Sequence, residues 1–160
     1  MRHTPQFLGV LLAITVLAGA AEPELGFAAV VHPSNREHDL HWRDLISLFE
    51  GVDREWPNSV PVVLVERNTG SAPYRYLMAH LLNTTSMGYK RRLQNIEYNG
   101  GAPVSIKILN SDEAACQFVF NVPSAIALIE RKSLSSTACA PVQVVRVDGK
   151  LPGEEGYRLK

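Results

Sequence analysis

Cysteine is scarce in this 160-residue chain, and charge of either sign is not in excess. The two cysteines are far apart and form no C-x-x-C pair, so the residues support neither a zinc ribbon nor a thioredoxin-like redox site. Sixteen basic side chains balance sixteen acidic ones, which argues against a nucleic-acid-binding surface. With 46% hydrophobic residues the chain is too apolar for a disordered polyampholyte, and its length suits one globular domain.

The sequence also lacks the short motifs of common catalytic sites. It contains no G-x-S-x-G elbow, no H-E-x-x-H helix and no Walker loop. Asp112 and Glu113 form an adjacent carboxylate pair, but the first turn of a helix favours acidic residues for electrostatic reasons alone. We therefore predict a protein that is not an enzyme and that uses no cofactor or metal.

The sequence has no hydrophobic run as long as a typical membrane-spanning helix. The apolar run from Phe7 to Ala18 covers about 12 residues, whereas a spanning helix needs about 20. It follows a short polar start and precedes the small residues at which a signal peptidase cuts. We interpret residues 1–20 as a secretory signal peptide, with an uncleaved anchor as the weaker alternative. Residues 21–160 would then form a mature periplasmic domain.

Cys116 and Cys139 are the only cysteines, and both fall in the mature part. An even cysteine count in an exported protein favours a single disulfide bond. The alternative is that Cys116, inside the apolar stretch 114–120, is a small buried hydrophobe.

From Phe27 onward, short β-branched runs alternate with segments of helical period, which is the pattern of an α/β domain. Asp39 is expected to cap the first helix, whose apolar positions share one face, and Gly51 to end it. We expect strands at residues 28–31, 60–65, 104–108, 125–129 and 142–147, and helices at 39–51, from 71–73 onward, at 85–96 and from 111 to 123.

Several short segments occur in a characteristic order: residues 31–35, 44–51, 56–58, 70–75, 98–100, 111–113 and 123–126. Together they resemble the phosphate-transporter type of periplasmic substrate-binding protein, in a short single-domain form. The resemblance implies a single three-layer lobe of the type 2 periplasmic-binding-protein kind, a mixed sheet with helices on both faces. It also implies a small anion as ligand and a membrane transporter or sensor protein as partner.

The segment from Arg67 to Arg75 is the strongest candidate for a binding site. It is a loop of small residues leading into a predicted helix, and such a loop exposes unpaired backbone N–H groups at the positive end of the helix dipole. Arginine binds phosphate or carboxylate through two parallel hydrogen bonds. We predict a site for a small inorganic or carboxylate anion, formed by Arg67, Thr69, Gly70, Ser71 and Arg75.

A simpler interpretation of the same residues makes Ser71 an ordinary helix cap and Arg75 a solvated charge. In the family that the chain resembles, this loop binds phosphate with an Arg, an Asp, a Ser and a Thr. The resemblance implies that Arg67 and Ser71 take the first and third of these places. Thr69 and Pro73 stand where the family has Asp and Thr.

Two functions are therefore open. The first is binding of a phosphate-like anion in transport or sensing. The second is a periplasmic interaction or accessory protein whose ligand pocket is vestigial. Two-lobed members of the family close around ligand between their lobes, whereas residues 21–160 are long enough for about one lobe.

Overall fold

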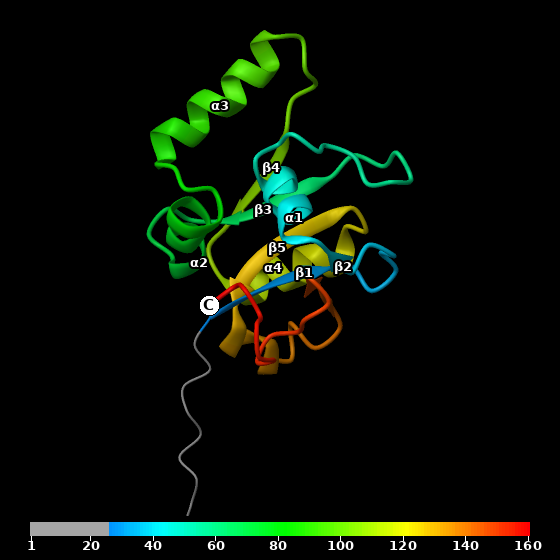
Figure 1. Ribbon diagram of the computed structural model, residues 1–160. Coiled ribbons are helices and arrows are strands. Elements are labelled where there is room, and N and C mark those ends of the chain that lie inside the picture. Colours follow the sequence, from blue (N-terminus) through cyan, green and yellow to red (C-terminus); the bar gives the residue numbers. More distant parts are fainter. Residues whose placement is uncertain (1–25) are drawn as a thin grey trace, which may run out of the picture.

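The computed structural model describes residues 26–160, in which a mixed sheet carries helices on both faces (Figure 1). The predicted signal peptide lies outside the described residues. The strands are β1 (Phe27–Val31), β2 (Asp39–Leu40), β3 (Val63–Arg67), β4 (Ser105–Leu109), β5 (Ala125–Glu130), β6 (Gln143–Val144) and β7 (Arg146–Val147). The helices are α1 (Trp42–Phe49), α2 (Ala72–Tyr76), a π-helical turn (Leu77–Leu81), α3 (Ser86–Tyr98), α4 (Asp112–Asn121) and a 3₁₀ turn (Arg131–Ser135).

The order of strands in the main sheet is β4-β3-β5-β1-β6, and a separate pair joins β2 to β7. β3 runs parallel to β4 and to β5, whereas β1 runs antiparallel to β5 and β6. The carboxyl ends of β3, β4 and β5 therefore meet at one edge of the sheet. The carboxyl end of β1 lies at the opposite edge.

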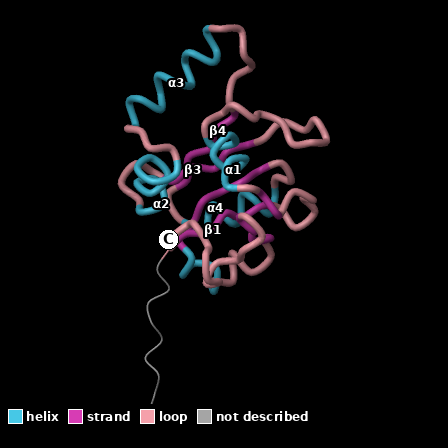
Figure 2. Tube along the Cα trace, in the orientation of Figure 1, coloured by secondary structure: helices cyan, strands magenta, loops and turns pink. Residues whose placement is uncertain are grey.

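Alternating side chains of the central strands fill two apolar cores. Ala29 and Val31 of β1 pack in the larger core with α1, α2 and the π-helical turn, while Ala28 and Val30 face α4. This alternation follows from the two-residue period of a strand, and it places a helical layer on each face of the sheet (Figure 2). The predicted three-layer α/β lobe with a mixed sheet is thus confirmed.

Two of the expected strands differ from the structure by more than a one-residue shift at an end. The strand expected at 60–65 begins at Val63, because Val60 is 41% exposed and lies in the preceding loop. The strand expected at 142–147 is two short strands, since β6 pairs with β1 whereas β7 pairs with β2. Val145 joins them, and its N–H donates to the carbonyl of Ala29 over 2.9 Å.

The expected cap of α1 by Asp39 is wrong. Asp39 lies in β2, where its carboxylate accepts the N–H of Gly149 at 3.2 Å. The N–H of Trp42, the first residue of α1, donates to Oδ1 of Asp148 over 3.0 Å. That bond lowers the pKa of Asp148, and the nearby side chains of Arg158 and His41 lower it further. Because β2 pairs with β7, Asp39 binds the turn after β7, and Asp148 of that turn caps α1 in its place.

Helix α3 is the element least packed against the sheet, and it forms an arm at one end of the molecule (Figure 1). It begins close to the predicted start, and the hydroxyl of Thr85 accepts the N–H of Gly88. Tyr89 is the one buried residue of the helix.

The predicted disulfide between Cys116 and Cys139 is present. It links the middle of α4 to the turn that precedes β6, with 5.0 Å between the two Cα atoms. Both residues belong to the smaller apolar core, so the alternative of an unpaired buried Cys116 does not hold.

Candidate functional site

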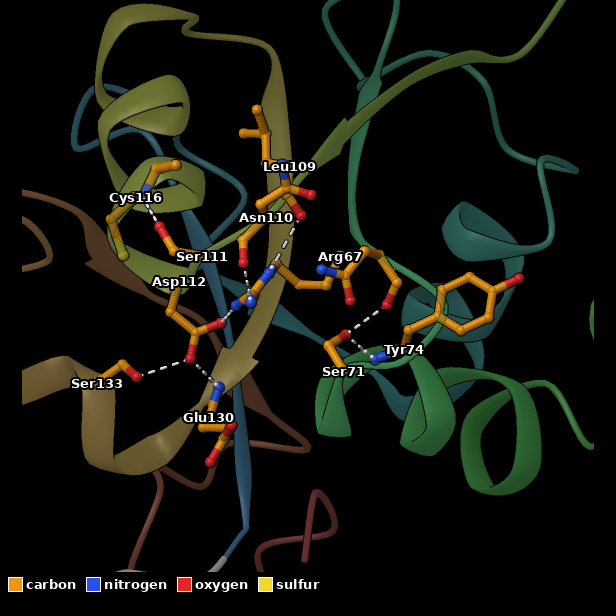
Figure 3. Close-up of polar contacts among 12 residues, drawn as sticks. Arg67, Ser71, Tyr74, Leu109, Asn110, Ser111, Asp112, Cys116, Glu130 and Ser133 are labelled. Atoms are coloured by element: carbon orange, nitrogen blue, oxygen red, sulfur yellow. Dashed lines mark hydrogen bonds and ion pairs between the residues drawn. The ribbon is translucent and has the colours of Figure 1, made fainter.

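The predicted site lies at the edge where β3, β4 and β5 end (Figure 3). Arg67 is the last residue of β3, and the exposed loop of Asn68, Thr69 and Gly70 follows it. Asn110 and Ser111 follow β4, and the chain turns there into α4. Residues from separate parts of the sequence are thereby brought to one surface.

The guanidinium of Arg67 faces the start of α4. Its Nε donates to the carbonyl of Leu109 over 3.3 Å and its Nη2 to the carbonyl of Asn110 over 2.8 Å. Its Nη1 forms an ion pair with Asp112, and the two side chains are only 10% and 6% exposed. Three donor groups of Arg67 are therefore engaged within the protein, and the structure does not bring this guanidinium to the exposed part of the loop.

Asp112 is a site residue that the sequence analysis explained only by the helix dipole. Its Oδ2 accepts the N–H of Glu130 at 3.1 Å and the hydroxyl of Ser133 at 2.7 Å. The carboxylate thus ties the ends of β4 and β5 to the arginine that ends β3. Its partner is 45 positions away, and no local pattern links the two.

The loop itself is held by Ser71 and Arg75. The Ser71 hydroxyl accepts the N–H of Tyr74 at 3.3 Å, which is the predicted helix cap, and donates to the carbonyl of Asn68 over 2.8 Å. Arg75 is exposed, and its Nη1 donates to the carbonyl of Gly70 over 2.6 Å. Gly70, Ser71 and Arg75 therefore come together as predicted, while the Arg67 guanidinium points to the other side (Figure 3).

Several backbone donors of the loop remain open. Within residues 26–160, no acceptor pairs with the N–H groups of Thr69, Gly70 or Ala72. Together with the remaining donors of Arg75, they form a short row of N–H groups next to a positive charge. Such a row can bind the oxygens of one small anion.

A buried carboxyl lies one residue before the site, on the other face of the sheet. Glu66 is 5% exposed, and its Oε1 lies 2.7 Å from the hydroxyl oxygen of Tyr89. Burial raises the pKa of Glu66, and the hydrogen bond to Tyr89 opposes this only in part. Glu66 therefore ties the α3 arm to β3 and does not face the loop.

No protein-family model and no curated protein matches the chain. Solved structures with the same fold are, however, found. PstS from Borrelia burgdorferi is 11% identical, with a TM-score of 0.66 over 84% of this chain and 54% of its own. An ABC-type phosphate transport receptor from Vibrio cholerae is 19% identical, with a TM-score of 0.64 over 84% of this chain and 53% of its own.

A third similar structure contains a ligand. It is a Clostridium perfringens protein described as a phosphate ABC transporter substrate-binding protein, solved with bound phosphate. It is 19% identical, with a TM-score of 0.61 over 80% of this chain and 47% of its own. The chain has the fold of one lobe of a type 2 periplasmic binding protein. It spans about half the length of these solved relatives, so the expected resemblance is confirmed at the level of fold.

Two further findings apply to residues 26–160. No helix in this range is long and apolar enough to cross a bilayer. The same residues contain no group of three or more His, Cys, Asp or Glu side chains placed to hold a metal ion.

Proposed function

We propose that the protein is an exported, non-enzymatic binding protein for a small phosphate-like anion, acting in transport or sensing. The observation that carries this proposal is the exposed loop at 69–72, whose open N–H groups lie beside Arg75 at the edge where three parallel strands end. Proteins of the same fold are described as phosphate-binding, and one of them holds phosphate. A membrane transporter or sensor protein would be the partner that receives the anion.

In this proposal Arg67 and Arg75 have different roles. Arg75 and the open N–H groups of the loop contact the anion. Arg67, engaged with Asp112, fixes the end of β3. Removing Arg67 would leave a buried carboxylate unpaired, so its substitution tests stability as much as binding.

Thermal unfolding with added phosphate, sulfate or acetate tests the binding role. A ligand that binds only the folded state stabilises it by about 2.7 kcal/mol at a hundredfold excess over Kd, which is a shift of several degrees. We expect phosphate to raise the midpoint and Arg75→Gln to remove most of that rise. Arg36→Gln is the control, because Arg36 is an exposed arginine in the loop after β1, at the opposite edge of the sheet. Equal shifts in both variants would refute the loop as the site.

Export is tested separately. We expect the mature protein to begin near Ala21 and to be recovered from the periplasmic fraction. Intact residues 1–20 on soluble cytosolic protein, found by mass spectrometry, would contradict this part of the proposal.

A second function is favoured by one specific observation. The donors of Arg67 are taken up by Leu109, Asn110 and Asp112, so the arginine expected to bind ligand is engaged internally. The protein could then be a periplasmic interaction or accessory protein with a vestigial pocket. The absence of any thermal shift with millimolar phosphate, sulfate or acetate would favour this second function.

A further inference from the structure

A separate cavity of about 360 Å³ lies beside the end of β5. Arg131 forms one wall, and the chain between Gly153 and Lys160 forms the others. The N–H of Phe27 donates to the carbonyl of Leu159 over 2.9 Å, which places the carboxyl-terminal segment alongside β1. The residues of the predicted loop site do not line this cavity.

The Arg131 guanidinium is unusual among the arginines of this structure. Its nitrogens reach solvent and are open to a ligand, since within residues 26–160 the buried side-chain atoms without a partner are Asn35 Nδ2 and Tyr157 Oη. Four other half-buried arginines each donate to a carbonyl or carboxylate: Arg54, Arg67, Arg92 and Arg146. Within residues 26–160, the Arg131 guanidinium has neither a hydrogen-bond acceptor nor a carboxylate within 4.0 Å.

The neighbouring chain leaves room for this guanidinium. Gly153 has a φ of +95°, which favours glycine. A Cβ at this position would lie 2.6 Å from Nη2 and 3.1 Å from Cζ of Arg131. Glycine at 153 therefore lets the guanidinium lie against the backbone while its donors stay uncommitted.

The charged side chains that line the cavity balance one another. Arg131 and Lys160 contribute two positive charges, and Glu154 and Glu155 contribute two negative ones. Glu154 accepts the N–H of Leu151 at 2.6 Å and forms no ion pair with Arg131. A lining without net charge gives a multiply charged anion no advantage over a singly charged one, so the direct contact with the guanidinium is what would hold the ligand.

Arg131 also borders a second hollow, of about 530 Å³. The apolar walls of that hollow are Leu134, Val142, Val144, Leu151 and Pro152. An anion bound to Arg131 could therefore place a hydrocarbon group against these side chains. Inorganic ions have no group that would use this surface.

We propose that Arg131 is the anchor of a second ligand site, which binds the carboxylate of a small organic acid with its apolar part beside Leu134 and Val144. The guanidinium donates two parallel hydrogen bonds to the carboxylate. This site is independent of the loop at 69–72 and of its proposed ligand.

Isothermal titration calorimetry with acetate, butyrate and phosphate tests the site. We expect butyrate to bind about tenfold more tightly than acetate, because two further methylene groups leave water. Arg131→Gln should remove butyrate binding, and Gly153→Ala should weaken it by displacing the guanidinium. The control is Lys132→Gln, since Lys132 is an exposed neighbour paired with Glu130. Arg75→Gln should leave butyrate binding unchanged.

Circular dichroism confirms that each variant is folded before titration. Butyrate binding that survives in folded Arg131→Gln, or that is lost equally in Lys132→Gln, would overturn the proposal. Failure of the parent protein to bind millimolar butyrate would also overturn it. Phosphate that displaces butyrate from the parent protein would refute the assignment of the site to an organic carboxylate. None of these outcomes affects phosphate binding through Arg75, so the two proposals fail separately.

Discussion

The guanidinium of Arg67 joins the carboxyl ends of three strands. It ends β3, donates to the backbone that follows β4, and pairs with Asp112, which accepts the N–H of Glu130 at the end of β5. Breaking a buried ion pair on one side leaves an uncompensated charge, which costs more than the pair contributes. The geometry of the loop that follows β3 therefore depends on this pair.

We expect Arg67→Met to lower the free energy of unfolding by about 3 kcal/mol, because Asp112 would remain buried without its cation. Urea unfolding measures the loss. Arg92→Met is the matched control: Arg92 pairs with Glu50, but their side chains are 37% and 27% exposed, so its loss should cost about 1 kcal/mol or less. Adding Asp112→Asn to the Arg67→Met variant should recover part of the stability. Equal costs for the two single variants would show that burial of the pair has no effect.

Glu66 is a second buried carboxyl, and burial dominates its pKa. The Tyr89 hydroxyl donates to Oε1 of Glu66 over 2.7 Å and lies 3.0 Å from the carbonyl of Phe49. The bond from Tyr89 favours the carboxylate, but desolvation by burial outweighs it, so the pKa of Glu66 is raised.

A raised pKa makes stability fall with pH. The folded protein holds the Glu66 proton more tightly than the unfolded chain, whose pKa for this group is near 4.5. The contribution is complete below that value, is lost as pH rises to the folded pKa, and stays lost above it. We expect Glu66→Gln, which cannot titrate but keeps an acceptor for the Tyr89 hydroxyl, to reduce this fall. Chemical unfolding from below pH 4.5 to neutral pH measures the free energy of unfolding at each pH. Glu97→Gln, at an exposed position, is the control. Identical pH profiles for Glu66→Gln and the parent would refute the linkage.

At the scale of elements, the sequence predicted which helices and strands exist better than where they begin. Apolar period and capping residues located α4 and α3, whose Ser111 and Thr85 caps are local signals. The cap of α1 and the break at Val145 depend on the pairing of β2 with β7. Pairing between distant segments is not encoded in local patterns, so the sequence could not predict these features.

The candidate site likewise has features that local sequence predicts and features that depend on distant segments. Ser71 and Arg75 hold the loop through contacts within five positions, and the sequence identified them. The direction of the Arg67 guanidinium depends on the position of Asp112, which follows β4 at the start of α4. The role of Arg131 depends on the carboxyl-terminal segment that folds back beside β1. These long-range placements required the structure.

The disulfide staples α4 to the turn before β6, across a sequence separation of 23 residues. In the chain-entropy account, closing a loop of this length stabilises the folded state by about 3 kcal/mol. We expect the double variant Cys116→Ala and Cys139→Ala to lose about that much in urea unfolding. Parent protein treated with reductant is the matched comparison, because it breaks the bond while keeping both side chains. If the reduced parent is as stable as the oxidised protein, the bond adds nothing to stability.

At the scale of the whole molecule, the described residues form one lobe of a fold whose solved relatives are about twice as long. The proposed anion site lies on an exposed loop at the edge of that lobe. An anion bound there keeps much of its contact with water. The Coulomb interaction with Arg75 is therefore weakened both by solvent and by salt.

These conditions define the affinity that we expect for phosphate. The loop that holds the proposed site is exposed, so the described residues do not enclose the anion, and we expect binding no tighter than micromolar. Because the Debye length falls from about 10 Å at 0.1 M salt to about 3 Å at 1 M, binding should weaken clearly over that range. Calorimetric titration of phosphate in sodium chloride measures both quantities, with Arg75→Gln showing the salt dependence that remains without the exposed arginine. Nanomolar affinity that does not change with salt would mean that the anion is enclosed, and would place it away from the exposed loop.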